Sequence, residues 1–476
     1  MIVNDNSFGI HLPDWEQLQF APATGIAGTN IVDDGQRFIY KYFQISTTAA
    51  QFWRYDTWCD CYQQLATPPT QTGTVANMFY TNNIGGQWSG RTHGAIYLFV
   101  GNGTVCYLYK YDVATNAWSA NLGTTNVPAA FGTDCYFGHP GPSRNNFEGG
   151  YHTAALRTIT VGATPIAVGA TSATVAALPE AMPVGARLRF GTFNITITSA
   201  VAKGATALAV SALPQGIAAG IVLTLPNGID VGVSSAAAAG ATSIPIFPLQ
   251  KAIESGTVIT VQRYVVLTAA AAASATSITI ASSLYTIETG ATALYYGNAY
   301  LIGNNATQIY RYNFGAAAWY TTSANSGNPA FPALPGAAGA GCAIKWLPGC
   351  APEKLWVLRG GGTSNTYMYD LYANTIATET YYPSTETFTT GTSVASREIG
   401  GKQCSLLIHK DATNRIYEGV PFKNTLEPKL NQNQLTHSTA VVGDKSCCIT
   451  TPEGQEYYYL LLHSSTSFVR CLMIDQ

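Results

Sequence analysis

A block in the middle of the chain repeats one short motif four times at a nearly constant spacing. The copies begin at Gly169, Gly204, Gly240 and Ser274, so the steps between them are 35, 36 and 34 residues. Each copy reads roughly GATSxxVxxLPxxxxxGxxLxF. Repetition at a fixed period indicates serial or stacked copies of one supersecondary unit. We therefore interpret residues 157–296 as an inserted domain of four repeats and consider the flanks separately.

The repeats have the composition of short β-strands. Runs rich in Thr, Val and Ile, such as 173–175, 188–190 and 195–197, are separated by Leu-Pro and Gly turns. Branched side chains favour strands, whereas Pro and Gly mark turns. We predict small β-modules in which two successive runs form one hairpin.

The flanks share a second, aromatic pattern. Gly94-Ala-Ile-Tyr leads to Tyr109-Lys-Tyr-Asp and then Trp118, and Gly297-Asn-Ala-Tyr leads to Tyr310-Arg-Tyr-Asn and then Trp319. Related units surround residues 52–56, 354–370, 415–427 and 457–475. Once the insert is removed, the Tyr-Asp positions recur at steps of 48 to 61 residues. Six units of four short strands predict a six-bladed β-propeller.

The two ends of the chain complement each other. The last unit stops at Asp475-Gln476, before its outer strand, while Trp15-Glu-Gln-Leu matches the outer-strand pattern Tyr62-Gln-Gln-Leu. We expect residues 14–28 to provide the outer strand of the sixth blade, which would hide an exposed sheet edge. The predicted domains are a first propeller part (1–156), the insert (157–296) and a second propeller part (297–476).

The flanking units resemble a known repeat. Ile/Leu-Tyr-x-x-Gly, then Tyr-x-Tyr-Asp, Trp and Pro, is similar to the kelch repeat of kelch-type propellers, over residues 35–156 and 297–476. The expected fold is therefore all-β: a six-bladed kelch-like β-propeller with an inserted four-repeat β domain.

Charge is scarce along the whole chain. Only 11 % of the residues are charged and the net charge is −2, against about 25 % charged residues in an ordinary soluble domain. Without a basic stripe, nucleic acid is excluded as a partner. The start of the chain has no signal-peptide pattern, and the apolar stretches are too short to span a bilayer. We expect synthesis in a cytoplasm and no membrane insertion.

Sites of chemistry are hard to find in this sequence. The ten cysteines include Cys59-x-Cys61 and Cys447-Cys448 but no zinc-type spacing, so we expect small buried thiols, with disulfides left open. Asp56, Asp112 and Asp370 recur at the structural period and are interpreted as turn residues. His93 and His152 occupy equivalent repeat positions. We predict no catalytic residues, no metal site and no cofactor, and we assign no binding residues.

Two functional hypotheses follow. The first is a non-enzymatic structural component of a phage virion, in the tail or associated with the capsid, because small inserted β-modules and low charge resemble virion proteins of tailed bacteriophages. Its partners would be other virion subunits in an oligomeric assembly, and a host surface glycan. The alternative is a carbohydrate-binding or carbohydrate-degrading propeller that acts on a host surface. Two carboxylates beside an exposed tryptophan would favour the alternative.

Overall fold

The computed structural model describes residues 15–473 with gaps, of which the largest are 82–94, 123–134, 139–157, 321–331 and 432–444. The described residues form β-strands, turns and loops without a helix. The all-β expectation is therefore confirmed. None of the described segments is a helix long and apolar enough to cross a membrane.

Six four-stranded antiparallel sheets form the blades, each written here from its innermost to its outermost strand. Blade 1 is β2 (Asn30–Asp33), β3 (Phe38–Gln44), β4 (Ala50–Asp56) and β5 (Cys61–Gln64); blade 2 is β6 (Val75–Thr81), β7 (Ala95–Gly101), β8 (Cys106–Asp112) and β9 (Ala117–Trp118). Blade 3 is β10 (Cys135–Gly138), β21 (Asn298–Gly303), β22 (Tyr310–Asn313) and β23 (Ala318–Tyr320); blade 4 is β24 (Ala343–Trp346), β25 (Lys354–Leu358), β26 (Thr366–Asp370) and β27 (Thr375–Glu379). Blade 5 is β28 (Ser393–Ile399), β29 (Gln403–His409), β30 (Arg415–Val420) and β31 (Thr425–Asn431); blade 6 is β32 (Lys445–Thr450), β33 (Glu456–Leu461), β34 (Phe468–Met473) and β1 (Trp15–Gln17).

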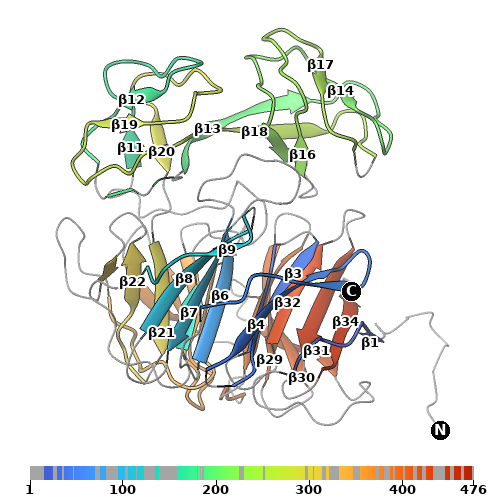
Figure 1. Ribbon diagram of the computed structural model, residues 1–476, viewed down its shortest axis with the longest axis vertical. Helices are drawn as coiled ribbons and strands as arrows, with labels where there is room; N and C mark the ends of the chain where they lie inside the picture. Colours follow the sequence, from blue (N-terminus) through green and yellow to red (C-terminus); the bar gives the residue numbers. More distant parts are fainter. Residues whose placement is uncertain are drawn as a thin grey trace.

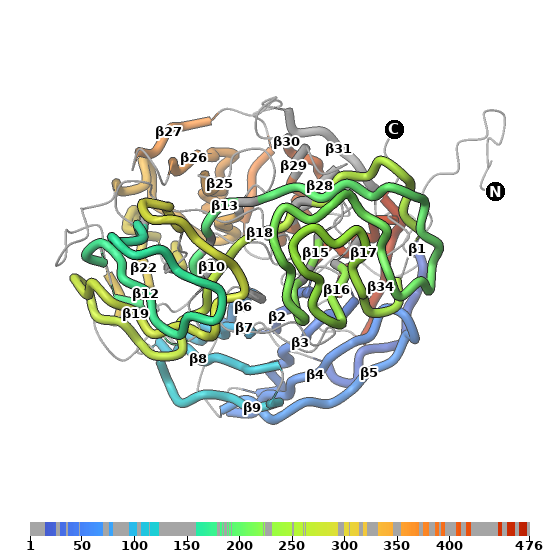
Figure 2. Tube along the Cα trace, turned by 90° about the horizontal axis from the view of Figure 1, so that it is seen from above, coloured from blue at the N-terminus to red at the C-terminus, as the bar shows by residue number. Residues whose placement is uncertain are grey.

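The blades surround a central axis (Figure 2). Each inner strand contacts the inner strand of the next blade, in the order β2, β6, β10, β24, β28, β32 and back to β2. Among the described residues, a separate buried apolar cluster fills each of the six blade-to-blade interfaces. This closed ring confirms the six-bladed propeller.

The repeated aromatic residues fill the interfaces between blades. Trp118 packs against Phe52 of blade 1, with ring centroids 5.0 Å apart, and its Nε1 donates a hydrogen bond to the Ala66 carbonyl oxygen at 2.9 Å. The equivalent Trp319 is buried and packs edge-on against Phe99 of blade 2. Each tryptophan therefore buries apolar surface against the neighbouring blade. Trp118 also has a hydrogen-bond acceptor for its N–H, and Trp319 has an edge-on aromatic contact.

The sixth blade takes its outer strand from the start of the chain. Strand β1 pairs antiparallel with β34, with Trp15 opposite Cys471. The chain continues along blade 6, because the Leu18 amide donates to the Phe468 carbonyl and the Ala21 amide to the Thr466 carbonyl. Leu18 and Ala21 are buried between blades 6 and 1. The ring is thus closed by non-covalent pairing of the two chain ends (Figure 1).

The insert lies above one end of the propeller and forms two lobes (Figure 1). Its strands are β11 (Thr158–Thr160), β12 (Ser172–Thr174), β13 (Arg187–Thr196), β14 (Ala207–Ala209), β15 (Val222–Thr224), β16 (Asp230–Gly232), β17 (Ser243–Pro245), β18 (Val258–Val266), β19 (Ser277–Thr279) and β20 (Thr292–Leu294). The long pair β13–β18 connects the lobes. One continuous buried cluster runs through both lobes and contains no described propeller residue.

The short strands at the start of the repeats pair in a nested order, contrary to the expectation of one hairpin from successive runs, although β15 and β16 of the second repeat do form such a hairpin. Strand β12 of the first repeat pairs with β19 of the fourth, and β14 of the second pairs with β17 of the third. The hydrogen bonds are reciprocal: the Val175 amide donates to the Thr276 carbonyl, and the Ile280 amide to the Thr171 carbonyl. Each lobe therefore consists of two repeats related by a local two-fold axis. The equivalent strand edges of the two repeats satisfy each other's backbone hydrogen-bonding groups.

Strands β10 and β21, which precede and follow the insert in the chain, are direct neighbours in blade 3. Strands β11 and β20, at the two ends of the insert, also pair with each other. The chain therefore leaves and returns at adjacent positions. The predicted boundaries at 156/157 and 296/297 lie outside the described residues.

Candidate functional site on blade 1

The turn between β4 and β5 gathers the most unusual group of side chains in the described part of the chain. It reads Asp56-Thr-Trp-Cys-Asp-Cys61. Asp60 has a left-handed backbone (φ 49°), like its counterpart Asn116 (φ 51°) in the turn between β8 and β9. Asparagine and aspartate tolerate this conformation better than other residues with a side chain. The tight turn places Trp58, Cys59 and Cys61 on the outside of the blade.

Trp58 is exposed yet held in place. It keeps 44 % of its surface accessible, and the Arg37 guanidinium lies 4.4 Å from its ring centroid. Arg37 in turn binds both carboxylate oxygens of Asp56: Nε donates to Oδ1 at 2.7 Å and Nη2 donates to Oδ2. Asp56 Oδ1 also accepts a hydrogen bond from the Trp58 amide at 3.0 Å. The result is an aromatic plane fixed beside a guanidinium and a carboxylate.

The charge of Asp56 is stabilised in this arrangement. Partial burial raises the pKa of its carboxyl, but the hydrogen bonds from Arg37 and the Trp58 amide outweigh that effect, so the pKa is lowered overall. At neutral pH Asp56 is therefore a carboxylate. It is suited to accept hydrogen bonds or to act as a base, and not to donate a proton.

Asp60 connects this turn to the chain end that closes the ring. Its Oδ1 accepts hydrogen bonds from the Tyr55 hydroxyl at 2.7 Å and from the Gln19 amide at 2.9 Å. In blade 2, Asn116 Oδ1 accepts from the Tyr111 hydroxyl at 2.7 Å and from the Ala66 amide at 2.9 Å. The two turns are thus equivalent clips that join one blade to the preceding one.

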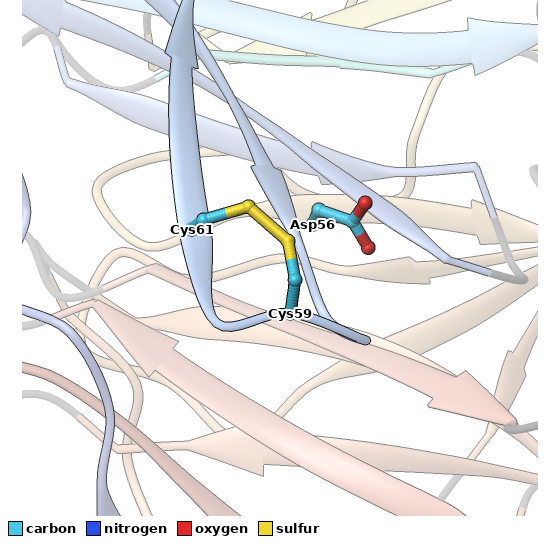
Figure 3. A group of neighbouring side chains, drawn as sticks. All are labelled: Asp56, Cys59 and Cys61. Carbon is cyan, nitrogen blue, oxygen red and sulfur yellow. A yellow bond between two sulfur atoms is a disulfide. The ribbon is translucent and has the colours of Figure 1, made fainter.

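Cys59 and Cys61 form a disulfide, and both residues are exposed (Figure 3). The expectation of buried thiols was wrong for this pair, because the left-handed residue between them brings their side chains to one side of the turn. It holds for Cys106, Cys342, Cys447, Cys448 and Cys471, which are buried. The other three cysteines lie outside the described side chains.

Asp56 lies beside the two sulfurs, so that the potential ligand atoms of the three residues are within 4.8 Å of one another. Metal ions bind thiolates, and a disulfide offers none. Asp56 is also engaged by Arg37. The group as it stands is therefore a redox pair next to an ion pair.

A second unusual residue, Lys41, is fully buried between blades 1 and 6. Its Nζ donates a hydrogen bond to the Tyr62 hydroxyl at 2.5 Å and lies 2.9 Å from the ring centroid of Phe468. Burial lowers the pKa of this amine well below its usual range, although Cys447 and Asp60 act in the opposite direction. Because the side chain is inaccessible, we interpret it as part of the interface.

The remaining residues that the sequence singled out have structural roles or lie outside the description. Asp112 accepts a hydrogen bond from the Thr115 amide at 2.9 Å, as expected of a turn residue. Asp370 pairs with Lys354 at 3.8 Å. His93 and His152 lie outside the described residues.

Sequence reasoning missed Trp58 and Arg37, although a signal was present. Tyr55 and Asp60 have the same spacing as Tyr111 and Asn116. Aligning the two turns would have placed the cysteines on either side of a left-handed residue. Nothing in the sequence near Arg37 indicates that it stacks on Trp58, because that contact joins the residue before β3 to the β4–β5 turn.

No protein-family model and no curated protein matches this chain. Solved structures with a similar fold include the α-L-arabinanase of Penicillium chrysogenum complexed with arabinobiose (7 % identity, TM-score 0.40, 97 % of this chain and 98 % of that one). Another is the GH93 α-L-arabinofuranosidase of Fusarium graminearum with arabinobiose (5 %, 0.41, 96 % and 97 %). A chain of a mitotic checkpoint complex is also similar (10 %, 0.36, 98 % of each chain). At these identities the likeness concerns the fold alone.

These comparisons correct the first functional hypothesis. Similar structures are named as an α-L-arabinanase and as α-L-arabinofuranosidases, which contradicts the interpretation as a non-enzymatic phage virion component and the prediction of no enzymatic activity. The comparisons support neither the kelch nor the phage resemblance.

Proposed function

We propose that the protein is a carbohydrate-binding or carbohydrate-degrading β-propeller, with the β4–β5 turn of blade 1 as its sugar contact. The observation that carries the proposal is the exposed Trp58 ring held against Arg37, with Asp56 paired to the same guanidinium. An aromatic ring offers an apolar plane to the C–H face of a sugar. A guanidinium and a carboxylate beside it supply the donors and acceptors that hydroxyl groups require.

The two aspartates of this turn are the carboxyl groups that we propose for the carbohydrate-degrading activity. Asp56 and Asp60 flank Trp58 in the sequence, and glycoside hydrolysis uses a pair of carboxyl groups on either side of the scissile bond. The lowered pKa of Asp56 suits the base or nucleophile and not the acid. Its ion pair with Arg37 would have to open for either role.

Binding can be tested on an array of plant, fungal and bacterial saccharides that includes arabinobiose, followed by calorimetry with the best ligand. Replacing Trp58 with alanine should weaken binding about tenfold or more, since the stacking plane is lost. Phe247 provides a matched control, because it is an exposed aromatic residue (46 %) on the insert. Phe247→Ala should bind like the parent protein. Absence of binding to every saccharide, or equal binding by Trp58→Ala, would contradict the proposal.

Cleavage is read in the same samples by the release of reducing ends. Asp56→Asn keeps the size of the side chain and removes its charge. If the protein degrades its ligand through this turn, Asp56→Asn should lower turnover by about 100-fold or more while retaining measurable binding. Turnover unaffected by this substitution would place the reaction elsewhere on the propeller.

A further inference from the structure

We propose that the Cys59–Cys61 disulfide is a thiol–disulfide exchange site for low-molecular-weight thiols, and that its oxidised state holds Asp60 against the chain end that closes the ring. Residues 15–21 are called the closing segment below. The proposal goes beyond carbohydrate recognition and needs no bound sugar.

The first observation is accessibility. Cys59 and Cys61 are exposed, whereas the other five cysteines whose side chains the structure describes are buried. Exchange requires a thiolate to reach one of the two sulfurs along the S–S bond. Among the described cysteines, this pair therefore meets that requirement best.

The second observation is that the turn does not need the disulfide. The corresponding turn of blade 2 has Thr115 and Ala117 at the positions of the two cysteines, and still holds Asn116 in the left-handed conformation with the same two hydrogen bonds. Moreover, a bond that encloses one intervening residue removes little freedom from the unfolded chain, since the effect grows with the length of the closed loop. A structural staple therefore explains this disulfide poorly.

The third observation is its position. Of the two equivalent clips, the one that carries the disulfide is the one that binds the closing segment, through the Gln19 amide. This segment is joined to the rest of its blade without a covalent link, by pairing of β1 with β34. Restricting the backbone around Asp60 restricts the carboxylate that receives Gln19. Opening the disulfide would free the backbone on both sides of Asp60 and weaken this clip alone.

The reaction consumes two equivalents of an external thiol. A thiolate attacks one cysteine sulfur, the S–S bond breaks, and the other cysteine leaves as a thiolate that takes a proton from water. A second external thiolate attacks the mixed disulfide, releases the remaining cysteine and forms the external disulfide. Two electrons pass from the external thiols to the protein, and the reverse sequence restores the bond.

The alternative to thiol–disulfide exchange is that the reduced cysteines bind a metal ion, because Asp56 lies beside both sulfurs (Figure 3). A cation there would have to displace Arg37, which binds both oxygens of Asp56. The ion pair therefore favours exchange over metal binding.

The exchange step is tested on the full chain in reduced and oxidised glutathione buffers, with iodoacetamide trapping and mass spectrometry. Cys59 and Cys61 should be alkylated together in one two-electron transition, while the five buried cysteines stay unmodified. The proposal fails if the pair resists excess reduced glutathione, or reacts only together with the buried cysteines. It also fails if zinc chloride protects the reduced pair from alkylation, since the site would then be a metal centre.

The effect on the closing segment is tested by hydrogen exchange at residues 18–21, with Ala66 of blade 2 as an internal control. Reduction should accelerate exchange of the Gln19 amide about fivefold, the worth of one hydrogen bond, and leave Ala66 unchanged. Cys59→Ser/Cys61→Ser should exchange as fast in oxidising buffer. Asp60→Gly keeps the disulfide and the positive φ but removes the carboxylate, so its Gln19 should exchange fast in both redox states. Equal exchange in all of these forms would overturn the proposal.

Discussion

At the scale of single residues, Ser274 stands where the other three repeats begin with glycine. The first residue of each repeat has a positive φ, between 79° and 86° at Gly169, Gly204 and Gly240, and 66° at Ser274. A side chain in this region costs about 1–2 kcal/mol, which glycine avoids at some loss of unfolded-state entropy. We expect Ser274→Gly to raise the free energy of unfolding of the insert by about 1 kcal/mol.

Gly204→Ser is the matched reverse change. A Cβ at Gly204 would meet no heavy atom within 4 Å, so the backbone angle is what the substitution tests. It should lower stability by a similar amount. Urea or thermal denaturation of the variants measures both effects. Equal stability of all three proteins would show that this angle carries no cost here.

Lys41 makes the stability of the propeller depend on pH. Because burial lowers its pKa in the folded state, the unfolded chain binds one more proton at any pH between the lowered value and the ordinary lysine pKa of about 10.4. Stability should therefore rise with pH across this window, by at most about 1.4 kcal/mol per pH unit. It should level off above the ordinary pKa.

Replacing Lys41 with methionine should remove this rise and stabilise the protein at neutral pH, because the substitution keeps the apolar stem and removes the buried amine. Lys354→Met, at a half-buried ion pair on β25, is the control and should keep the pH dependence. Denaturation curves between pH 6 and 10 decide the matter. A Lys41→Met protein with the slope of the parent would contradict the assignment.

At the scale of elements, the short strand β1 should contribute strongly to the stability of the propeller, because it covers the edge of the last blade. Deleting residues 15–21 would expose the edge of β34 and the cavity left by Leu18 and Ala21. We expect a loss of about 3 kcal/mol or more and self-association through the open edge. Light scattering and thermal melting measure the two effects.

Removing only the surface ion pair between β1 and β34 should change the stability of the protein little. Arg470 Nε binds Glu16 Oε2 at 2.6 Å, but the Glu16 side chain is 56 % exposed. Exposed pairs contribute about 0–1 kcal/mol, so Glu16→Gln should melt close to the parent. A truncated protein that is monomeric and melts like the parent would show that β1 is dispensable.

At the scale of the whole molecule, the described residues bury two independent sets of side chains. The cluster that fills the insert shares no residue with the six clusters between blades. Replacing residues 157–296 with a short Gly/Ser linker should therefore leave the propeller folded. We expect its free energy of unfolding to change by less than about 1 kcal/mol, since β10 and β21 are adjacent and short loops close at low cost. A shortened chain that fails to fold would show that the insert completes the propeller core.

Periodicity determined what the sequence alone could reveal. A unit that recurs at a nearly constant step is expected to build the same supersecondary structure each time, so the six recurrences of the aromatic unit, as at Tyr111 with Trp118 and Tyr312 with Trp319, were enough to predict six blades. The turn role of Asp112 followed for the same reason. Neither prediction required knowing which residues touch across blades.

The tertiary structure alone decided which repeats pair and which side chains form the candidate site. Strands β12, β14, β17 and β19 have similar sequences, so their edges could pair with any copy; because the chain enters and leaves through the adjacent β11 and β20, the first repeat is placed beside the fourth. In the same way, Arg37 reaches Trp58, and Lys41 becomes buried, only after neighbouring strands have assembled. Local pattern specifies the elements, whereas burial and long-range contacts arise from how the closed ring brings distant residues together.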